Sequence, residues 1–157
     1  MKRMLCVLSI VVGLMPLAPA PVVAVGEEAR SVTGAAAGLF GAGATLGAVA
    51  IEGVELGTGV FIEADGSASG TFHAVLRGSS LGIAQQITLE GKVSEGSVSP
   101  EGRATFSGTG SLDVGDGGPP LAGVAFSVTA ASDGLVLTIA STPLPAAGLT
   151  TGVITIE

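Results

Sequence analysis

Several residue types are missing from this chain, and each absence narrows the chemistry open to it. Tryptophan, tyrosine and asparagine do not occur, and there is one cysteine, Cys6, and one histidine, His73. Zinc sites are normally built from cysteine and histidine, so a zinc centre is excluded. Without asparagine there is no acceptor for N-glycosylation. The five phenylalanines are the only aromatics, which leaves few anchors for a sugar or for a tight protein interface.

Basic residues are also scarce, with 6 Lys and Arg against 13 Asp and Glu. Removal of residues 1–24, a predicted signal peptide described next, takes away Lys2 and Arg3. It leaves 4 basic and 13 acidic residues and hence a formal net charge of −9. An acidic chain is repelled by phosphate backbones and by anionic lipid headgroups. Nucleic acid is therefore not expected as a partner.

The segment 1–24 has the layout of a signal peptide. It starts with the basic residues Lys2 and Arg3 and continues with an apolar run at residues 4–17. Small residues follow at Ala18, Ala20 and Ala24. The run is shorter than the roughly 20 residues that span a bilayer, and Cys6 lies inside it, not just after it where a lipid would be attached. Cleavage is expected after Ala24, with Ala20 as the alternative site. We therefore predict a protein outside the cytoplasm, in periplasm, cell wall or medium, with no membrane span after cleavage.

Alternation of apolar and polar residues is the main structural signal in the rest of the chain. It is clearest at 87–93, where Ile87, Leu89 and Val93 share one face while Thr88 and Glu90 lie on the other. Further strands are expected at 60–64, 71–77, 103–112, 124–129, 134–140 and 152–156. Turn signals separate them at 65–66, 77–80, 99–102, 116–120 and 132–134.

Short strands at this spacing predict an all-β fold, a single antiparallel β-sandwich or a small β-barrel after a cleaved N-terminal signal helix. The 133 residues that follow the signal suit one domain. We divide the chain into the signal peptide 1–24, a flexible segment 25–33 and the all-β domain 34–157. The uncharged, glycine-rich stretch 34–51 is the ambiguous part, with a packed pair of strands or a membrane-associated segment as the two interpretations.

No residue stands out as catalytic, cofactor-binding or metal-binding. His73 is expected on the solvent face of its strand, opposite Phe72, and no Gly-x-Ser-x-Gly motif supplies a nucleophile for it. Oxygen ligands for calcium occur in two acidic turns, but neither turn has the spacing of a calcium loop. These residues are Glu63, Asp65 and Ser67 in one turn and Asp113 and Asp116 in the other. We therefore expect no enzyme activity, no cofactor and no metal.

Four short stretches carry a resemblance to known proteins: GTFH at 70–73, ITLEGKV at 87–93, ATFSGTG at 104–110 and VAFSVTA at 124–130. They resemble small β-domains found on secreted bacterial proteins, which often stand beside cell-surface anchoring or repeat modules and have no assigned function. Abundant Ala, Gly and Val with little Lys also indicates GC-rich coding and a bacterial source. The resemblance implies no catalytic residue.

These features predict a secreted, non-catalytic structural or interaction module of the bacterial cell envelope or extracellular space. Its partner would be an envelope component or another protein, and Phe61 is the candidate contact residue because Val60 and Ile62 would face the core. The alternative is a carrier of a small apolar ligand inside a β-barrel. Its cavity would be lined by Phe72, Leu76, Leu89 and Phe106.

Overall fold

A computed structural model describes residues 28–157 of the chain. The predicted signal peptide 1–24, and with it the choice between cleavage after Ala24 and after Ala20, lies outside the described residues. Within 28–157 the elements are strands, with no helix. In order, they are β1 (Arg30–Phe40), β2 (Thr45–Leu46), β3 (Val49–Ile62), β4 (Ser67–Ser80), β5 (Ile83–Val98), β6 (Ala104–Asp113), β7 (Leu121–Ala131), β8 (Gly134–Ile139), β9 (Thr142–Pro143) and β10 (Ala147–Ile156). The predicted all-β fold is confirmed.

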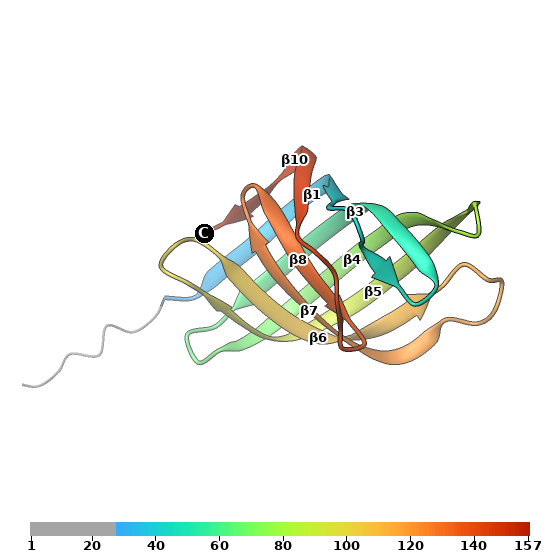
Figure 1. The fold of residues 1–157 in the computed structure, drawn as a ribbon. Helices are drawn as coiled ribbons and strands as arrows, with labels where there is room; N and C mark the ends of the chain where they lie inside the picture. The colour runs from blue at the N-terminus through green and yellow to red at the C-terminus, as the bar shows by residue number, and fades with distance from the viewer. Residues whose placement is uncertain (1–27) are drawn as a thin grey trace, which may run out of the picture.

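All pairings are antiparallel, and they close the sheet into a barrel. The neighbours run β1-β10-β8-β7-β6-β5-β4-β3-β2, and β1 also pairs with β3. The first long strand thus lies between the last strand and β3, which joins the two sides of the sheet (Figure 1). The short strands β2 and β9 pair with β3 and β8. Of the two architectures expected, the strand pairing is that of a barrel.

Alternate residues of each strand face the inside of the barrel, where they form one apolar core. Ile87, Leu89 and Val93 of β5 are buried as their spacing predicts, while Glu90 is exposed. At the centre Phe72 stacks on Phe126, with ring centroids 5.6 Å apart, and meets Phe106 edge-on at 5.7 Å. Such pairs add to the stabilisation that burial of the rings already supplies.

The turn expected at 77–80 is wrong, because β4 continues to Ser80. The chain reverses at Leu81 and Gly82, whose φ angles of 51° and 78° are those of the tight turns that join paired strands. Gly78 is a glycine for a different reason. A Cβ at this position would collide with the backbone carbonyl of Ala50 on β3, so the residue permits close approach of two strands. The other expected turns lie between strands, except that Gly134, the last residue of the turn expected at 132–134, begins β8.

The stretch 34–51 contains most of β1, all of β2 and the start of β3. β1 pairs with β3 and β10 rather than with β2, and it begins at Arg30, so the segment expected to be flexible over 25–33 overlaps a strand. β3 likewise begins well before the expected strand 60–64, and a register shift between Ile51 and Gly53 interrupts its alternation near its start. No helix in the part of the chain that the structure describes is long and apolar enough to cross a membrane.

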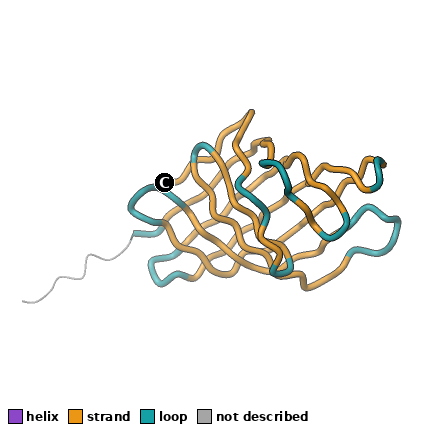
Figure 2. The backbone as a smooth tube through the Cα atoms, viewed as in Figure 1, coloured by secondary structure: helices purple, strands orange, loops and turns teal. Residues whose placement is uncertain are grey.

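The turns gather at the two ends of the barrel (Figure 2). The β3–β4, β5–β6 and β7–β8 turns lie at the end where β1 begins and β10 finishes. The β4–β5 and β6–β7 turns lie at the opposite end. Because consecutive strands are antiparallel, every second turn belongs to the same end.

Candidate interaction surface

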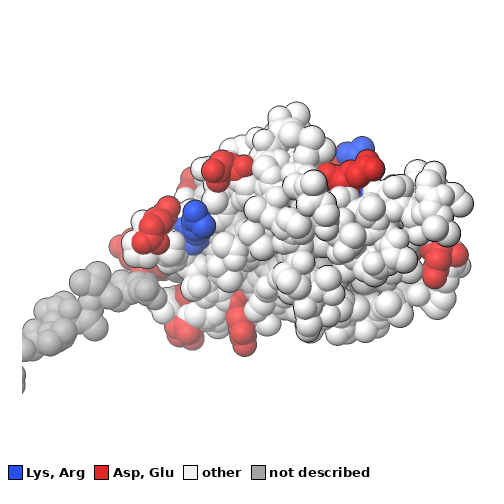
Figure 3. Space-filling model, in the orientation of Figure 1, with Lys and Arg blue, Asp and Glu red and all other residues white. Residues whose placement is uncertain are grey.

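Acidic side chains are concentrated at the end of the barrel where the described chain begins and finishes (Figure 3). The three turns, the neighbouring part of β5 and the chain ends contribute seven carboxylates: Glu28, Glu63, Asp65, Glu95, Glu101, Asp133 and Glu157. Two basic residues, Arg30 and Arg103, lie at the same end. We call this region the acidic end. Its excess of negative charge attracts cationic groups and repels anionic ones.

Two adjoining clefts lie at the acidic end. One, of about 610 Å³, is lined by Asp65, Ser67, Glu95 and further polar residues of β5 and β6. The other, of about 360 Å³, has an apolar floor of Ile62, Val98 and Ile156 with Glu28, Glu63 and Arg30 at its side. Gly66, Gly96 and Ser97 line both clefts. An apolar floor beside charged groups is the combination that binding clefts use for contact and orientation.

β10 leaves one of its backbone edges unpaired beside these clefts. It pairs with β8 only at Ala147 and Gly148, and the Leu149 amide donates to the Asp133 carbonyl. Beyond that point, no backbone partner for this edge occurs among residues 28–157. We call residues 150–156 of β10, on the side away from β1, the open edge. Such an edge is a template for pairing with another strand.

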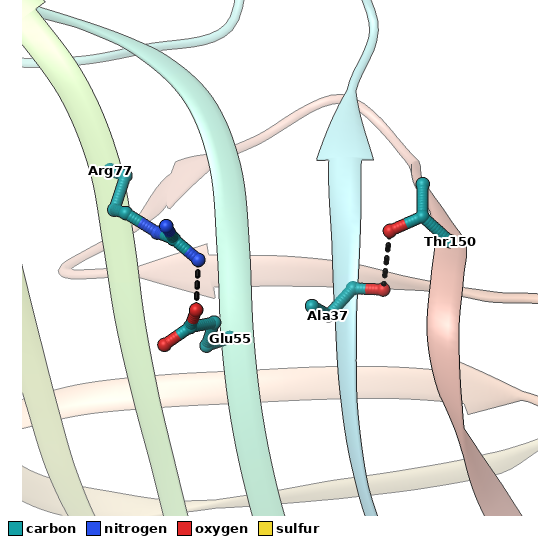
Figure 4. Close-up of polar contacts among 4 residues, drawn as sticks. All are labelled: Ala37, Glu55, Arg77 and Thr150. Atoms are coloured by element: carbon teal, nitrogen blue, oxygen red, sulfur yellow. Dashed lines mark hydrogen bonds and ion pairs between the residues drawn. The ribbon is translucent and has the colours of Figure 1, made fainter.

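A bulge marks the point where β10 turns away from β8. Ala37 of β1 pairs with Thr151 and Gly38 pairs with Leu149, so Thr150 is an extra residue without a partner on β1. Its hydroxyl donates to the Ala37 carbonyl at 3.1 Å (Figure 4). A bulge bends the strand that contains it, and this one lies just beyond the last β8–β10 pair. The pairing itself ends because β8 begins at Gly134, opposite Gly148.

His73 is on the exposed face of β4, as expected, with Gly57 and Glu90 as its cross-strand neighbours. Asp65 lies in the β3–β4 turn, and the strand from Ser67 to His73 extends about 20 Å at 3.3 Å per residue. The structure therefore does not bring His73 and Asp65 together. On the same outer surface, Arg77 pairs with Glu55 (Figure 4), but both side chains are more than half exposed, and such ion pairs contribute little to stability.

Three of the four carboxylates considered for calcium, those of Asp65, Asp113 and Asp116, make hydrogen bonds within their own turns. Asp65 accepts bonds from the amide and the hydroxyl of Ser67, at 2.9 and 2.6 Å, and these bonds hold the pKa of its carboxyl below the ordinary value. Asp113 and Asp116 each accept one bond from the amide two residues ahead, at 2.8 Å. No group of three or more His, Cys, Asp or Glu able to hold a metal occurs in the described part of the chain. These carboxylates stabilise turns.

Phe61 points outward with 45% of its surface exposed, while Val60 and Ile62 on either side of it are buried. It lies on the β3 strand near the acidic end and pairs with Ser31 and Ser69. The residues proposed to line an apolar cavity are buried and belong to one core cluster: Phe72, Leu76, Leu89 and Phe106. The clefts of about 610, 360 and 260 Å³ all reach the surface, and Phe106 is the one member of this set that lines any of them.

No family model, curated protein or solved structure matches this chain. The resemblance to small secreted β-domains thus stays a prediction.

The sequence reasoning missed both the acidic end and the open edge. The first had a usable signal, because Glu63 and Asp65, then Glu101, then Asp133 occupy every second turn. In an up-and-down arrangement of strands these turns share one end. The open edge had no comparable signal, since it depends on where β10 stops pairing with β8.

Proposed function

We propose that this protein is an exported, non-catalytic interaction module of the cell envelope or extracellular space, and that its acidic end is the surface that contacts a partner. The acidic end carries this proposal, because it combines concentrated charge, two clefts and an unpaired strand edge. Export rests on the signal-like segment 1–24. The partner is an envelope component or another protein.

The filled interior supports an interaction module over a carrier of apolar ligands. Phe72 contacts the rings of both Phe106 and Phe126 inside the barrel. A Cβ added to Gly91 would already collide with the ring of Phe126, so the packing there is close. A carrier needs an internal volume of several hundred cubic ångströms, whereas the clefts described here open at the surface.

The absence of a catalytic arrangement around His73 among the described residues supports a non-catalytic role. A histidine acts as a general base when a nucleophile lies within hydrogen-bond distance and a third group orients it. The residues paired with His73 are Gly57 and Glu90, neither of which is a nucleophile of that kind.

Site-specific crosslinking tests the proposal. A photoreactive residue replaces either Glu101, in the β5–β6 turn of the acidic end, or Gly117, in the β6–β7 turn at the opposite end. Each variant is expressed from the native gene locus in the host organism, and the intact cells are irradiated in culture. We expect a discrete crosslinked species from position 101 and none from position 117. Equal crosslinking from both positions, or none from either, would contradict a contact surface at the acidic end.

The same culture tests export. We expect the protein in an extracytoplasmic fraction. Its intact mass should be that of a chain that begins at Val25. Retention of the full-length mass in the cytoplasm would contradict export, whatever the crosslinking result.

A further inference from the structure

The open edge of β10 presents backbone groups that are ready for a partner strand. At its end, the Ser31 amide donates to the Glu157 carbonyl at 2.8 Å and the Glu157 amide donates to the Ser31 carbonyl at 3.0 Å. In an antiparallel pair, residues that exchange both bonds alternate with residues whose N–H and C=O point the other way. The amides and carbonyls of Ile154 and Ile156 therefore point away from β1, toward the open edge.

The side chains along this edge favour an extended occupant. The sequence of residues 150–156, TTGVITI, is uncharged, lacks proline and is rich in β-branched residues. Charged or proline residues are the usual protection of an exposed edge, and this edge has neither. Ile154 is buried in the core while Val153 is 58% exposed, so the strand itself is firmly held.

The edge also runs between two clefts. The cleft of about 260 Å³ near Gly148 is lined by Asp133 and Arg103. The cleft of about 360 Å³ at Ile156 is lined by Glu28, Glu63 and Arg30. A strand added along β10 would therefore have its own ends beside carboxylates at both clefts, each cleft also holding one arginine, and the carboxylates outnumber the arginine at the Ile156 end.

We propose that the open edge of β10 takes an extended, basic segment of a partner protein as an added antiparallel strand. Backbone hydrogen bonds to Ile154 and Ile156 supply the pairing, and basic side chains near the ends of the segment meet the carboxylates of the acidic end. This inference rests on the proposed function and specifies the chemistry of the partner.

Charge argues against a second copy of this chain as the occupant. Pairing of β10 with β10 of another copy would bring two acidic ends together, each with seven carboxylates and two arginines. Facing charges of the same sign are destabilising across paired strands. A basic partner removes that repulsion and replaces it with attraction.

Amide hydrogen exchange, measured by NMR on the exported protein labelled with nitrogen-15, tests the inference. The probe is the peptide Lys-Thr-Val-Thr-Val-Thr-Lys with blocked ends, titrated to about ten times its Kd, because the protection of an exposed amide by a ligand is 1 + [L]/Kd. We expect the Ile154 and Ile156 amides to exchange about tenfold more slowly when it is bound. The Thr155 amide faces β1 and serves as the internal control, with little change.

Two control peptides separate strand pairing from simple charge attraction. One has every internal amide N-methylated, which keeps the charge but removes the donors, and the other has Glu in place of both Lys. We expect neither to protect Ile154 or Ile156. Equal protection by the methylated peptide, or no protection by the basic peptide, would overturn the inference.

Variants locate the charge contribution. Glu63→Gln combined with Glu157→Gln should weaken binding of the basic peptide about twofold to threefold per charge removed. The matched control Glu52→Gln, on β3 near the opposite end, should leave it unchanged. Protection of Ile154 and Ile156 that rises with protein concentration in the absence of peptide would identify a second copy as the occupant and overturn the inference. If the basic peptide does not protect Ile154 and Ile156 but position 101 still crosslinks to a partner, strand addition at the open edge is refuted and the proposed function stands.

Discussion

A single hydroxyl interrupts the apolar interior. Thr58 of β3 faces inward opposite Phe72, and its Oγ1 is buried without a hydrogen-bond partner in residues 28–157. A buried polar atom without a partner loses its bonds to water and gains none in return, which costs about 1–3 kcal/mol. Threonine and valine have nearly the same shape, so this site offers a direct measure of that cost.

We predict that Thr58→Val raises the free energy of unfolding by about 1 kcal/mol, because it removes the unpartnered hydroxyl without opening a cavity. Urea denaturation followed by circular dichroism measures the change. Thr71→Val, on the exposed face of β4, is the control and should change stability by less than about 0.5 kcal/mol. A decrease for Thr58→Val would indicate that a water molecule bonds to the hydroxyl.

Asp65 provides a second residue with a measurable property. The Ser67 hydroxyl, followed by the Ser67 amide, stabilises the ionised carboxylate, so its pKa is lowered in the folded protein. A lowered pKa contributes stability that is present above the ordinary pKa of the group. That stability is lost as the pH falls through the folded value.

We therefore predict that Ser67→Ala raises the pKa of Asp65 toward its ordinary value, because it removes the largest of these contributions. NMR titration of the Asp65 carboxyl carbon measures this directly. The variant should also lose less of its stability on acidification than the unmodified protein. An unchanged pKa would mean that the backbone amide alone holds the carboxylate.

At the scale of the strand, alternation predicted the inward and outward faces correctly wherever the strand is regular. His73 and Phe61 point outward and Leu89 is buried, because side chains in a regular strand alternate strictly. Prediction failed where the strand is irregular or its partner decides the outcome. The shift between Ile51 and Gly53 obscured the start of β3, and Gly57 and Gly59, a residue type depleted in strands, obscured its middle. Gly78 resembled a turn residue although it lets β3 and β4 approach closely.

The candidate surface was less predictable than the strands. The sequence shows that alternate turns carry acidic residues. These residues form one surface only when the strands are assembled into the barrel. The open edge depends on the long-range register of β10 against β8, in which Gly148 pairs with Gly134, the first residue of β8, so that residues 150–156 extend past β8. Nothing in the local sequence TTGVITI distinguishes an open edge from a paired one.

Packing between strands gives a prediction at the same scale. Gly91→Ala places a methyl group against the ring of Phe126, which stacks on Phe72. We predict a loss of about 1–3 kcal/mol in the free energy of unfolding, since extra volume in a well-packed core forces side chains to move. Thermal and urea denaturation measure the loss.

Gly57→Ala is the matched control for Gly91→Ala. Gly57 is also in a strand, but no atom lies within 4 Å of its added Cβ. This variant should be neutral or slightly stabilising, because alanine restricts the unfolded chain. Equal losses of stability at both positions would mean that alanine destabilises these strands through the backbone, and not through the contact with Phe126.

At the scale of the whole molecule, stability comes from the closed sheet and its core without any sulfur chemistry. The only cysteine, Cys6, is in the segment 1–24 that we predict to be removed. The exported protein would therefore contain neither thiol nor disulfide, in a compartment where disulfides are common.

We predict that the unfolding midpoint of the exported protein is the same with and without a reducing agent. Differential scanning calorimetry measures both midpoints. Uncleaved protein retains Cys6 and is the control, since it should form reducible dimers on a non-reducing gel. A midpoint that falls on reduction would show that the cysteine is retained and forms a disulfide.

The way the barrel closes also determines the order in which it can fold. Most pairings join strands that follow one another along the chain, such as β3–β4 and β4–β5, and these hairpins can form as soon as both strands are present. The pairing of Val32 with Ile156 is different, because it joins the first strand to the last. Contacts of such high sequence separation slow folding. When the chain is synthesised from its N-terminus, β1 can pair with β3 early, but its other edge has no partner yet. The barrel closes only after β10 has been synthesised and pairs with that edge.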